Sequence, residues 1–287
     1  MFIKCISSLL LIIFFCTLIS NAQENQVQSL KGIRKELKKK FFFYWGYNRA
    51  IYTRSDIHLS GANYDITVFD VTAHDRPSPF TFKEYFGPTS WSVPQYNYRI
   101  GYYFTERFSI SFGQDHMKYV MDANQTAKLS GVISPEASEK YAGSYLETPI
   151  TVTPDFLSYE HTDGLNLFSL DIEYTLPLAK FFQNKLLIDL NAGVGGIWMG
   201  PRSDVRVFGY GLNNDYHVAG YSMTAKAGPQ MEFFRHYFLR AQARAGYVTL
   251  PSVLIHNDEP DHADQNFSFM EWYIVAGILL PFKTSAK

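Results

Sequence analysis

The last strand-like segment, residues 270–282, constrains the fold of this chain more than any other feature. It reads MEWYIVAGILLPF. Alternate residues of a β-strand point to opposite faces, so one face of this segment is wholly apolar. That face carries Trp272, Ile274, Ala276, Ile278, Leu280 and Phe282. Such a face has to be covered, either by a protein core or by lipid.

The same alternation recurs upstream and predicts seven more strands. They span residues 41–53, 95–104, 107–121, 164–178, 185–200, 216–233 and 237–250. Their connections are alternately long and short, which is typical of an antiparallel up-and-down transmembrane β-barrel with short periplasmic turns and long extracellular loops. The sequence therefore predicts an all-β barrel of eight strands. The first long loop is expected to carry a hairpin that includes Tyr64–Val71, and the alternation slips after Gly113, which predicts a bulge.

The N-terminus predicts export. Residues 1–22 combine a basic residue, a short apolar run and small residues before the expected cleavage site, as in a secretory signal peptide. Cys5 and Cys16 both lie inside this leader, so the mature chain is expected to contain no disulfide and no thiolate nucleophile. The predicted organisation is a signal peptide (1–22), a periplasmic lead-in (23–40), the barrel (41–283) and a C-terminal tail (284–287).

Composition favours a membrane barrel over its soluble rival. The formal net charge is −1, so nothing suggests a nucleic-acid partner. A secreted sandwich or lipocalin-like barrel would keep the apolar faces inside, and strand periodicity alone does not exclude it. The aromatic content of 17%, the loop asymmetry and the C-terminal strand favour the membrane.

At the level of architecture, residues 41–282 resemble the outer-membrane β-barrel proteins of Gram-negative bacteria. The ending Gly277-Ile278-Leu279-Leu280-Pro281-Phe282 is similar to the C-terminal assembly signal of that class, with two departures. Pro281 lies inside the strand, and residues 283–287 follow the aromatic residue. The resemblance implies residence in the outer membrane, contact with outer-membrane lipid and lipopolysaccharide, and insertion by the barrel-assembly machinery.

The inward-facing positions of the predicted strands carry charges of both signs. An eight-stranded barrel has an interior that side chains can fill, and unpaired charges there would cost several kcal/mol each. We therefore expect a network of paired charges that plugs the lumen, to which Glu271 also belongs. Its predicted members are Arg99, Asp171, Glu173, Asp189, Lys226, Glu232, Arg240 and Arg244. A narrow path for protons or small ions is the alternative.

Histidines gather at the predicted outer rim. The segment His161-Thr162-Asp163 could form a catalytic group for acyl-ester cleavage, with His161 as base and Thr162 or water as nucleophile. Outer-membrane lipid A deacylases have a His-centred site on a similar barrel, but their His-x-Ser-Asn type of motif is not reproduced. Asp115, His116 and His74 are the predicted binding residues at the rim. A transition metal could also suit several His and Asp residues, but the prediction is no metal site and no cofactor.

The sequence thus predicts an integral outer-membrane barrel with a structural or surface-interaction role and a plugged lumen. An extracellular ligand at the loops is a further candidate partner. A lipid-modifying hydrolase remains as the second interpretation and a narrow ion channel as the third, and the balance is against an enzyme.

Overall fold

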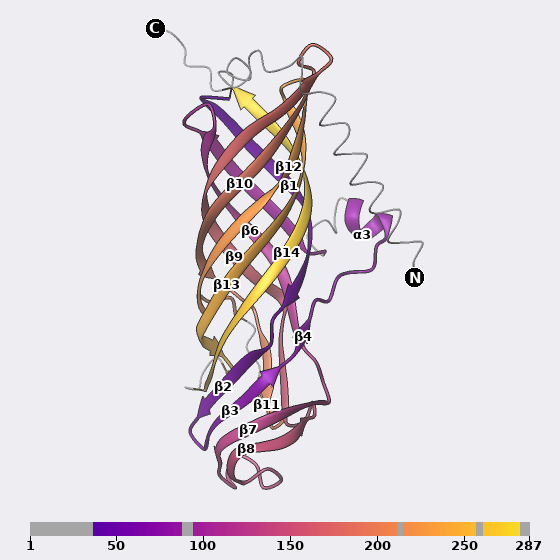
Figure 1. Ribbon diagram of the computed structural model, residues 1–287. Helices are drawn as coiled ribbons and strands as arrows, with labels where there is room; N and C mark the ends of the chain where they lie inside the picture. The colour runs from indigo at the N-terminus through magenta and orange to yellow at the C-terminus, as the bar shows by residue number, and fades with distance from the viewer. Residues whose placement is uncertain (1–36, 88–93, 212–214, 257–260, 282–287) are drawn as a thin grey trace, which may run out of the picture.

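The computed structural model describes residues 37–87, 94–211, 215–256 and 261–281, but not the side chain of Asp163. Within these ranges eight antiparallel strands form a closed ring (Figure 1). The wall strands are β1 (Lys40–Tyr52), β5 (Tyr96–Tyr103), β6 (Phe108–Met121), β9 (Leu157–Phe181), β10 (Leu186–Met199), β12 (Gly220–Phe233), β13 (Tyr237–Leu254) and β14 (His262–Pro281). The ring closes between its first and last strands, where β1 pairs with β14 from Lys40–Pro281 to Tyr52–Phe269. The predicted signal peptide, most of the lead-in and the C-terminal tail lie outside the described residues.

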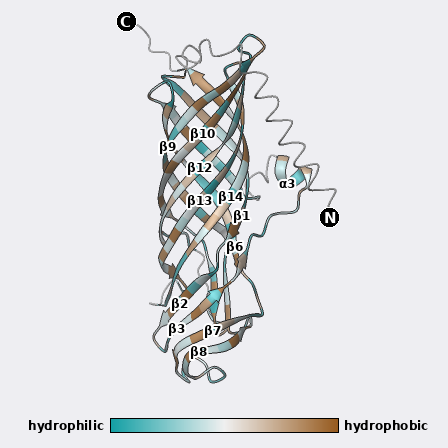
Figure 2. Cartoon of the chain, in the orientation of Figure 1, coloured by the Kyte–Doolittle hydropathy of each residue, from teal (hydrophilic) through white to brown (hydrophobic). Residues whose placement is uncertain are grey.

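The wall is apolar outside and polar inside, as the alternation predicts. Hydrophobic and hydrophilic positions alternate along the wall strands in Figure 2. The ten outward apolar side chains named next are between 38% and 69% exposed, whereas Asp171 and Arg240 are buried in the lumen. The outward set includes Phe43, Ile100, Phe112, Leu170, Ile172, Leu190, Val194, Leu239, Trp272 and Ile274. A contiguous apolar belt of this size is unfavourable in water, so it faces acyl chains, and we call it the lipid belt.

The sequence pattern of β1 does not distinguish an apolar from a polar face, and the closed ring fixes which way each residue points. Tyr44, Asn48 and Ala50 are buried inside, while Trp45 and Tyr47 lie on the outer surface. Inward alternation continues along β6 past Gly113. The register irregularity of this strand lies between Met117 and Tyr119, against β9.

Short turns join the strands at one end of the barrel, which is at the top of Figure 1. Residues 182–184 and 234–235 take positive φ values between 51° and 68°, which lets two of these turns reverse the chain within a few residues. Long connections join the strands at the opposite end, which we call the outer end.

At the outer end the sheet continues beyond the ring. β2 (Ser55–Gly61) pairs with β14, and β3 (Tyr64–Val71), β7 (Gln125–Ile133) and β8 (Gly143–Val152) follow in that order. The hairpin expected at Tyr64–Val71 is therefore confirmed. Two short strands, β4 (Ala73–His74) and β11 (Asp204–Val207), pair with β6 and β9. Together these strands form an extension of the barrel, visible at the bottom of Figure 1.

The extension has its own hydrophobic core, and this explains why some wall strands are longer than the sequence predicts. β9 begins at Leu157 rather than residue 164, and β14 begins at His262 rather than 270. The added residues cover a core that includes Ile57, Val68, Leu129, Tyr159, Val205 and Phe267.

A short helix, α3 (Phe82–Phe86), lies beside the barrel (Figure 1). Thr81 caps it by accepting a hydrogen bond from the Glu84 backbone N–H at 3.1 Å. Tyr85 fastens it to the outer face of β1, where Arg49 donates to the Tyr85 hydroxyl at 2.6 Å and Tyr47 donates to the Tyr85 carbonyl.

Among the residues that the structure describes, no helix is long and apolar enough to cross a membrane.

Candidate functional site

Charged side chains from six wall strands meet inside the barrel. The cations are Arg99 on β5, Lys226 on β12, and Arg240 and Arg244 on β13. The carboxylates are Asp115 on β6, Asp171 and Glu173 on β9, and Glu271 on β14. We call these eight residues the lumen network. Each occupies an inward position of the two-residue period, and each is at most 4% exposed.

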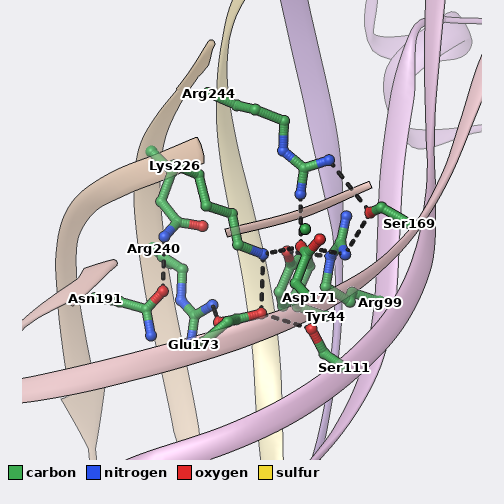
Figure 3. Close-up of polar contacts among 12 residues, drawn as sticks. Tyr44, Arg99, Ser111, Ser169, Asp171, Glu173, Asn191, Lys226, Arg240 and Arg244 are labelled. Atoms are coloured by element: carbon green, nitrogen blue, oxygen red, sulfur yellow. Dashed lines mark hydrogen bonds and ion pairs between the residues drawn. The ribbon is translucent and has the colours of Figure 1, made fainter. Parts of the chain in front are cut away.

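Asp171 is the centre of the lumen network. Its Oδ2 lies 2.6 Å from Lys226 Nζ and 2.8 Å from Arg244 Nη2, and Arg99 donates to the same oxygen. Figure 3 shows these cations directed toward Asp171. Arg99 and Arg244 also donate to Asp115. One carboxylate thus holds three cations that come from three different strands.

Glu173 extends the lumen network along the same strand. Its two oxygens lie 2.9 Å from Lys226 Nζ and 2.9 Å from Arg240 Nη1, and it accepts a hydrogen bond from Ser111 at 2.6 Å (Figure 3). Glu271 is the weakest partner, at 3.6 Å from Arg244 Nε. Four cations therefore meet three carboxylates at close contact distance, Asp115, Asp171 and Glu173, and these contacts offset part of the penalty for burying charge.

Aromatic and neutral polar side chains hold the lumen network in place. The guanidinium of Arg240 lies 5.2–5.7 Å from the ring centroids of Phe42, Tyr44 and Phe238, within cation–π range. The Tyr44 hydroxyl also accepts from Arg99 Nε at 2.9 Å. Asp189 and Glu232, both buried, lie among the inward residues beside this network, and Asp189 accepts from Gln230 at 3.4 Å.

Apolar clusters lie on both sides of the lumen network. Toward the short turns, a cluster of Leu37, Phe42, Tyr44, Tyr103, Phe238, Tyr273, Val275 and Leu279 fills the lumen. Toward the outer end, the core of the extension follows. Buried side chains of the two clusters thus lie on either side of the lumen network.

The structure does not bring the predicted catalytic residues together. His161 points inward and is fully buried, with Nδ1 2.7 Å from Ser203 Oγ and its ring against Tyr119 and Tyr159. Thr162 lies on the opposite face of β9 and donates to Glu160 at 2.9 Å. The side chain of Asp163 lies outside what the structure describes. Adjacent strand residues point to opposite faces, which separates His161 from Thr162.

The environment of His161 is that of a core residue. It lies in the part of β9 that belongs to the extension, beyond the lipid belt. Burial, helped by His217, lowers the pKa of His161 to about 3, so its imidazole is neutral. Arg76 pairs with Glu160 through two contacts of 3.0 Å.

The three predicted binding residues also separate. Asp115 turns inward and belongs to the lumen network, while His116, the next residue, turns outward. His74 is exposed and pairs with Asp122 in the extension.

His116 instead lines a pocket in the outer wall that sequence reasoning missed. This wall pocket has a volume of about 720 Å³ and lies where β5, β6, β9 and β10 meet residues of the 200–219 connection. Its lining residues are Tyr96, Gln114, His116, Lys118, Thr162, Asn166, Phe168, Trp198, Gly200, Arg202, Tyr216, His217 and Val218.

The polar floor of the wall pocket is ordered by hydrogen bonds. Asn166 Oδ1 lies 2.8 Å from His116 Nδ1 and accepts from Gln114 at 2.8 Å, while Asn166 Nδ2 donates to the Gly200 carbonyl at 3.0 Å. The His116 ring stacks on Tyr96, with centroids 4.9 Å apart and planes 6° from parallel.

A glycine next to this floor makes the arrangement sterically feasible. Gly164 has φ +131°, and a Cβ built on it would lie 2.5 Å from the Asn166 amide and 2.8 Å from the His116 ring. Residues with a side chain rarely adopt this φ. Glycine at position 164 therefore suits both the backbone conformation and the small space beside Asn166 and His116.

Comparison with known proteins bears on the fold alone. No protein-family model matches the chain, and no curated protein matches it. Solved structures that resemble it include the outer membrane protein AlkL in lipid bilayers, with 10% identity over 87% of this chain and 94% of that one and a TM-score of 0.35. The outer membrane protein OprG from Pseudomonas aeruginosa is 7% identical over 85% of this chain and 97% of that one, with a TM-score of 0.36. Neisserial surface protein A is 11% identical over 84% of this chain and 97% of that one, with a TM-score of 0.31.

Proposed function

We propose that the protein is a non-conducting outer-membrane barrel with a surface-interaction role. The observation that carries the proposal is the lumen network, which fills the barrel with paired side chains and has apolar clusters on both sides. An ion that crossed it would have to break several charge-assisted contacts in a space with little water, where each break costs several kcal/mol.

The extension supports an interaction role at the cell surface. A barrel that served only to strengthen the envelope would need no folded unit above the membrane, yet four strands here continue the wall as a sheet with its own core. Its last strand, β8, pairs with β7 on one side and has mostly exposed side chains. Outer-membrane lipid, lipopolysaccharide or an extracellular ligand would contact this end, and the barrel-assembly machinery would insert the chain.

Planar-bilayer recording tests the proposal. The protein should insert, as judged by its heat-dependent mobility on a gel, and should produce no conductance steps. A double variant, Arg240→Ala with Lys226→Ala, opens space beside Glu173 and should give measurable steps, which verifies that insertion was productive. Stable steps from the unmodified protein would refute the closed-barrel proposal and would favour the channel.

A second candidate is a lipid-modifying hydrolase centred on His116 rather than His161. The contact that favours it joins His116 Nδ1 to Asn166 Oδ1. Since an amide oxygen accepts, this contact favours the imidazole tautomer with the proton on Nδ1. In that tautomer Nε2 has the lone pair that a general base for acyl-ester cleavage by water uses. Mass spectra of lipid A from cells with the native protein, His116→Ala and no protein decide the question. Identical spectra would remove this candidate.

A further inference from the structure

The wall pocket has an apolar side that is continuous with the lipid belt. Trp198 stacks on Phe168 at 5.4 Å between ring centroids and lies 6.1 Å from Phe112. Phe112 is a member of the belt and is 42% exposed. An acyl chain lying along the barrel would therefore reach the aromatic side of the pocket without leaving the apolar surface.

The opposite side of the wall pocket carries basic side chains. Lys118 lies on β6, four residues beyond Gln114, the residue that pairs with Phe168. At 3.3 Å per residue this places it about 13 Å further along the strand from the aromatic side. Arg202 is fixed by its backbone N–H, which donates to Gly164 at 3.1 Å, and its guanidinium lies 6.0 Å from the Tyr216 ring.

We propose that the wall pocket binds a phosphorylated acyl lipid of the outer leaflet. The acyl chain would lie against Phe168 and Trp198, and the phosphate would be bound by Lys118 and Arg202. Cationic donors and a phosphate form strong charge-assisted hydrogen bonds, and tryptophan is favoured at the level where acyl chains meet head groups. This inference rests on the membrane residence given under the proposed function. It adds the class of lipid that binds one surface of the barrel, the wall pocket.

Other regions suit a lipid less well. A second pocket, of about 160 Å³, lies at the tip of the extension between residues such as Tyr64, Phe208 and His256. It lies in the extension, away from the lipid belt along the barrel axis, and Asp261 in its lining would disfavour an anion.

Native mass spectrometry of the detergent-purified protein provides the test. The probe is lipid A, compared with lipid A from which the phosphates have been removed. We expect one lipid A per barrel, bound at least ten-fold more tightly than the dephosphorylated form. Lys118→Gln and Arg202→Gln should each weaken lipid A binding by roughly ten-fold, the loss expected for one charge-assisted contact. Lys128→Gln, which changes an exposed cation of the extension, should bind as the native protein does.

The outcomes separate the two proposals. Equal binding of the two lipid forms, or unchanged binding by Lys118→Gln and Arg202→Gln, overturns the pocket assignment and leaves the closed barrel intact. Vesicle flotation and the gel mobility of the folded barrel are measured on the same samples. Failure of the native protein to insert into vesicles would instead overturn the membrane-barrel function itself.

Discussion

Replacing Asp171 by asparagine should destabilise the barrel more than any change at an exposed ion pair. Asp171 Oδ2 contacts three cations, all of them buried, and an amide of the same size removes the charge with little change in shape. The four cations of the lumen network would then have only two carboxylates, Asp115 and Glu173, at close contact distance. Breaking a buried pair by removing one partner costs about 3–5 kcal/mol, so we expect a loss in this range for the free energy of unfolding.

The measurement is urea unfolding in lipid vesicles, followed by tryptophan fluorescence and by the fraction that keeps folded mobility on a gel. Glu147→Gln is the matched control, because Glu147 pairs with Lys128 at 2.8 Å while both side chains are more than half exposed. Ion pairs between exposed side chains contribute little to stability, because water screens their charges. Equal effects of Asp171→Asn and Glu147→Gln would refute the claim that paired charges stabilise the lumen.

A double variant then tests whether unpaired charge causes the loss of stability in Asp171→Asn. Lys226 contacts both Asp171 and Glu173, so Lys226→Met removes one cation from the same part of the lumen network. In Asp171→Asn with Lys226→Met, one cation that lost its contact with Asp171 is removed together with that carboxylate. The double variant should lose less stability than the sum of the single variants, by about 0.5–3 kcal/mol, as expected for residues in direct contact.

Three further predictions concern the outer end. Because the pKa of His161 is about 3 when folded against 6.5 when exposed, the unfolded chain binds the extra proton between about pH 6 and pH 4. The unfolding free energy should fall by about 1.4 kcal/mol per unit as the pH decreases, and His161→Gln should show a smaller slope in urea titrations. Gly164→Ala should weaken lipid A binding in mass spectrometry, because its Cβ would displace His116 and Asn166; unchanged binding would contradict the pocket geometry. Tyr85→Ala should release α3 from β1 and speed tryptic cleavage after Lys83 in the detergent-purified protein, whereas Tyr210→Ala, an exposed residue, should not.

The wall could be predicted from the sequence because two environments enforce the same period. Lipid outside requires apolar side chains, and the narrow lumen requires paired charges or small residues. Inward positions such as Ser109, Asp171 and Arg240 therefore alternate with outward ones such as Ile110 and Ile172. The number of strands, the facing of the wall strands other than β1, and the short turns follow from this period.

The outer end was harder to predict, because there the apolar residues of the strands turn into a protein core. Leu157 and Tyr159 continue the alternation of β9 but pack inside the extension. The two-residue period nevertheless indicates which face of β6 Asp115 occupies. Asp115 has the same parity as Ser109 and belongs inside, so Asp115 and His116 could not both have served one rim site. The wall pocket itself requires four strands and a loop to converge, which no local pattern encodes.

The pairing of β1 with β14 has a consequence for biogenesis. The N-terminal strand has its permanent neighbour on one side only when the segment ending at Pro281 has been made, some 230 residues later along the chain. A product that lacks β14 has two sheet edges with unpaired backbone N–H and C=O groups, which the bilayer interior does not tolerate. The ring can therefore close only after β14 has been made, and a product that lacks β14 is not expected to enter the membrane as a closed barrel.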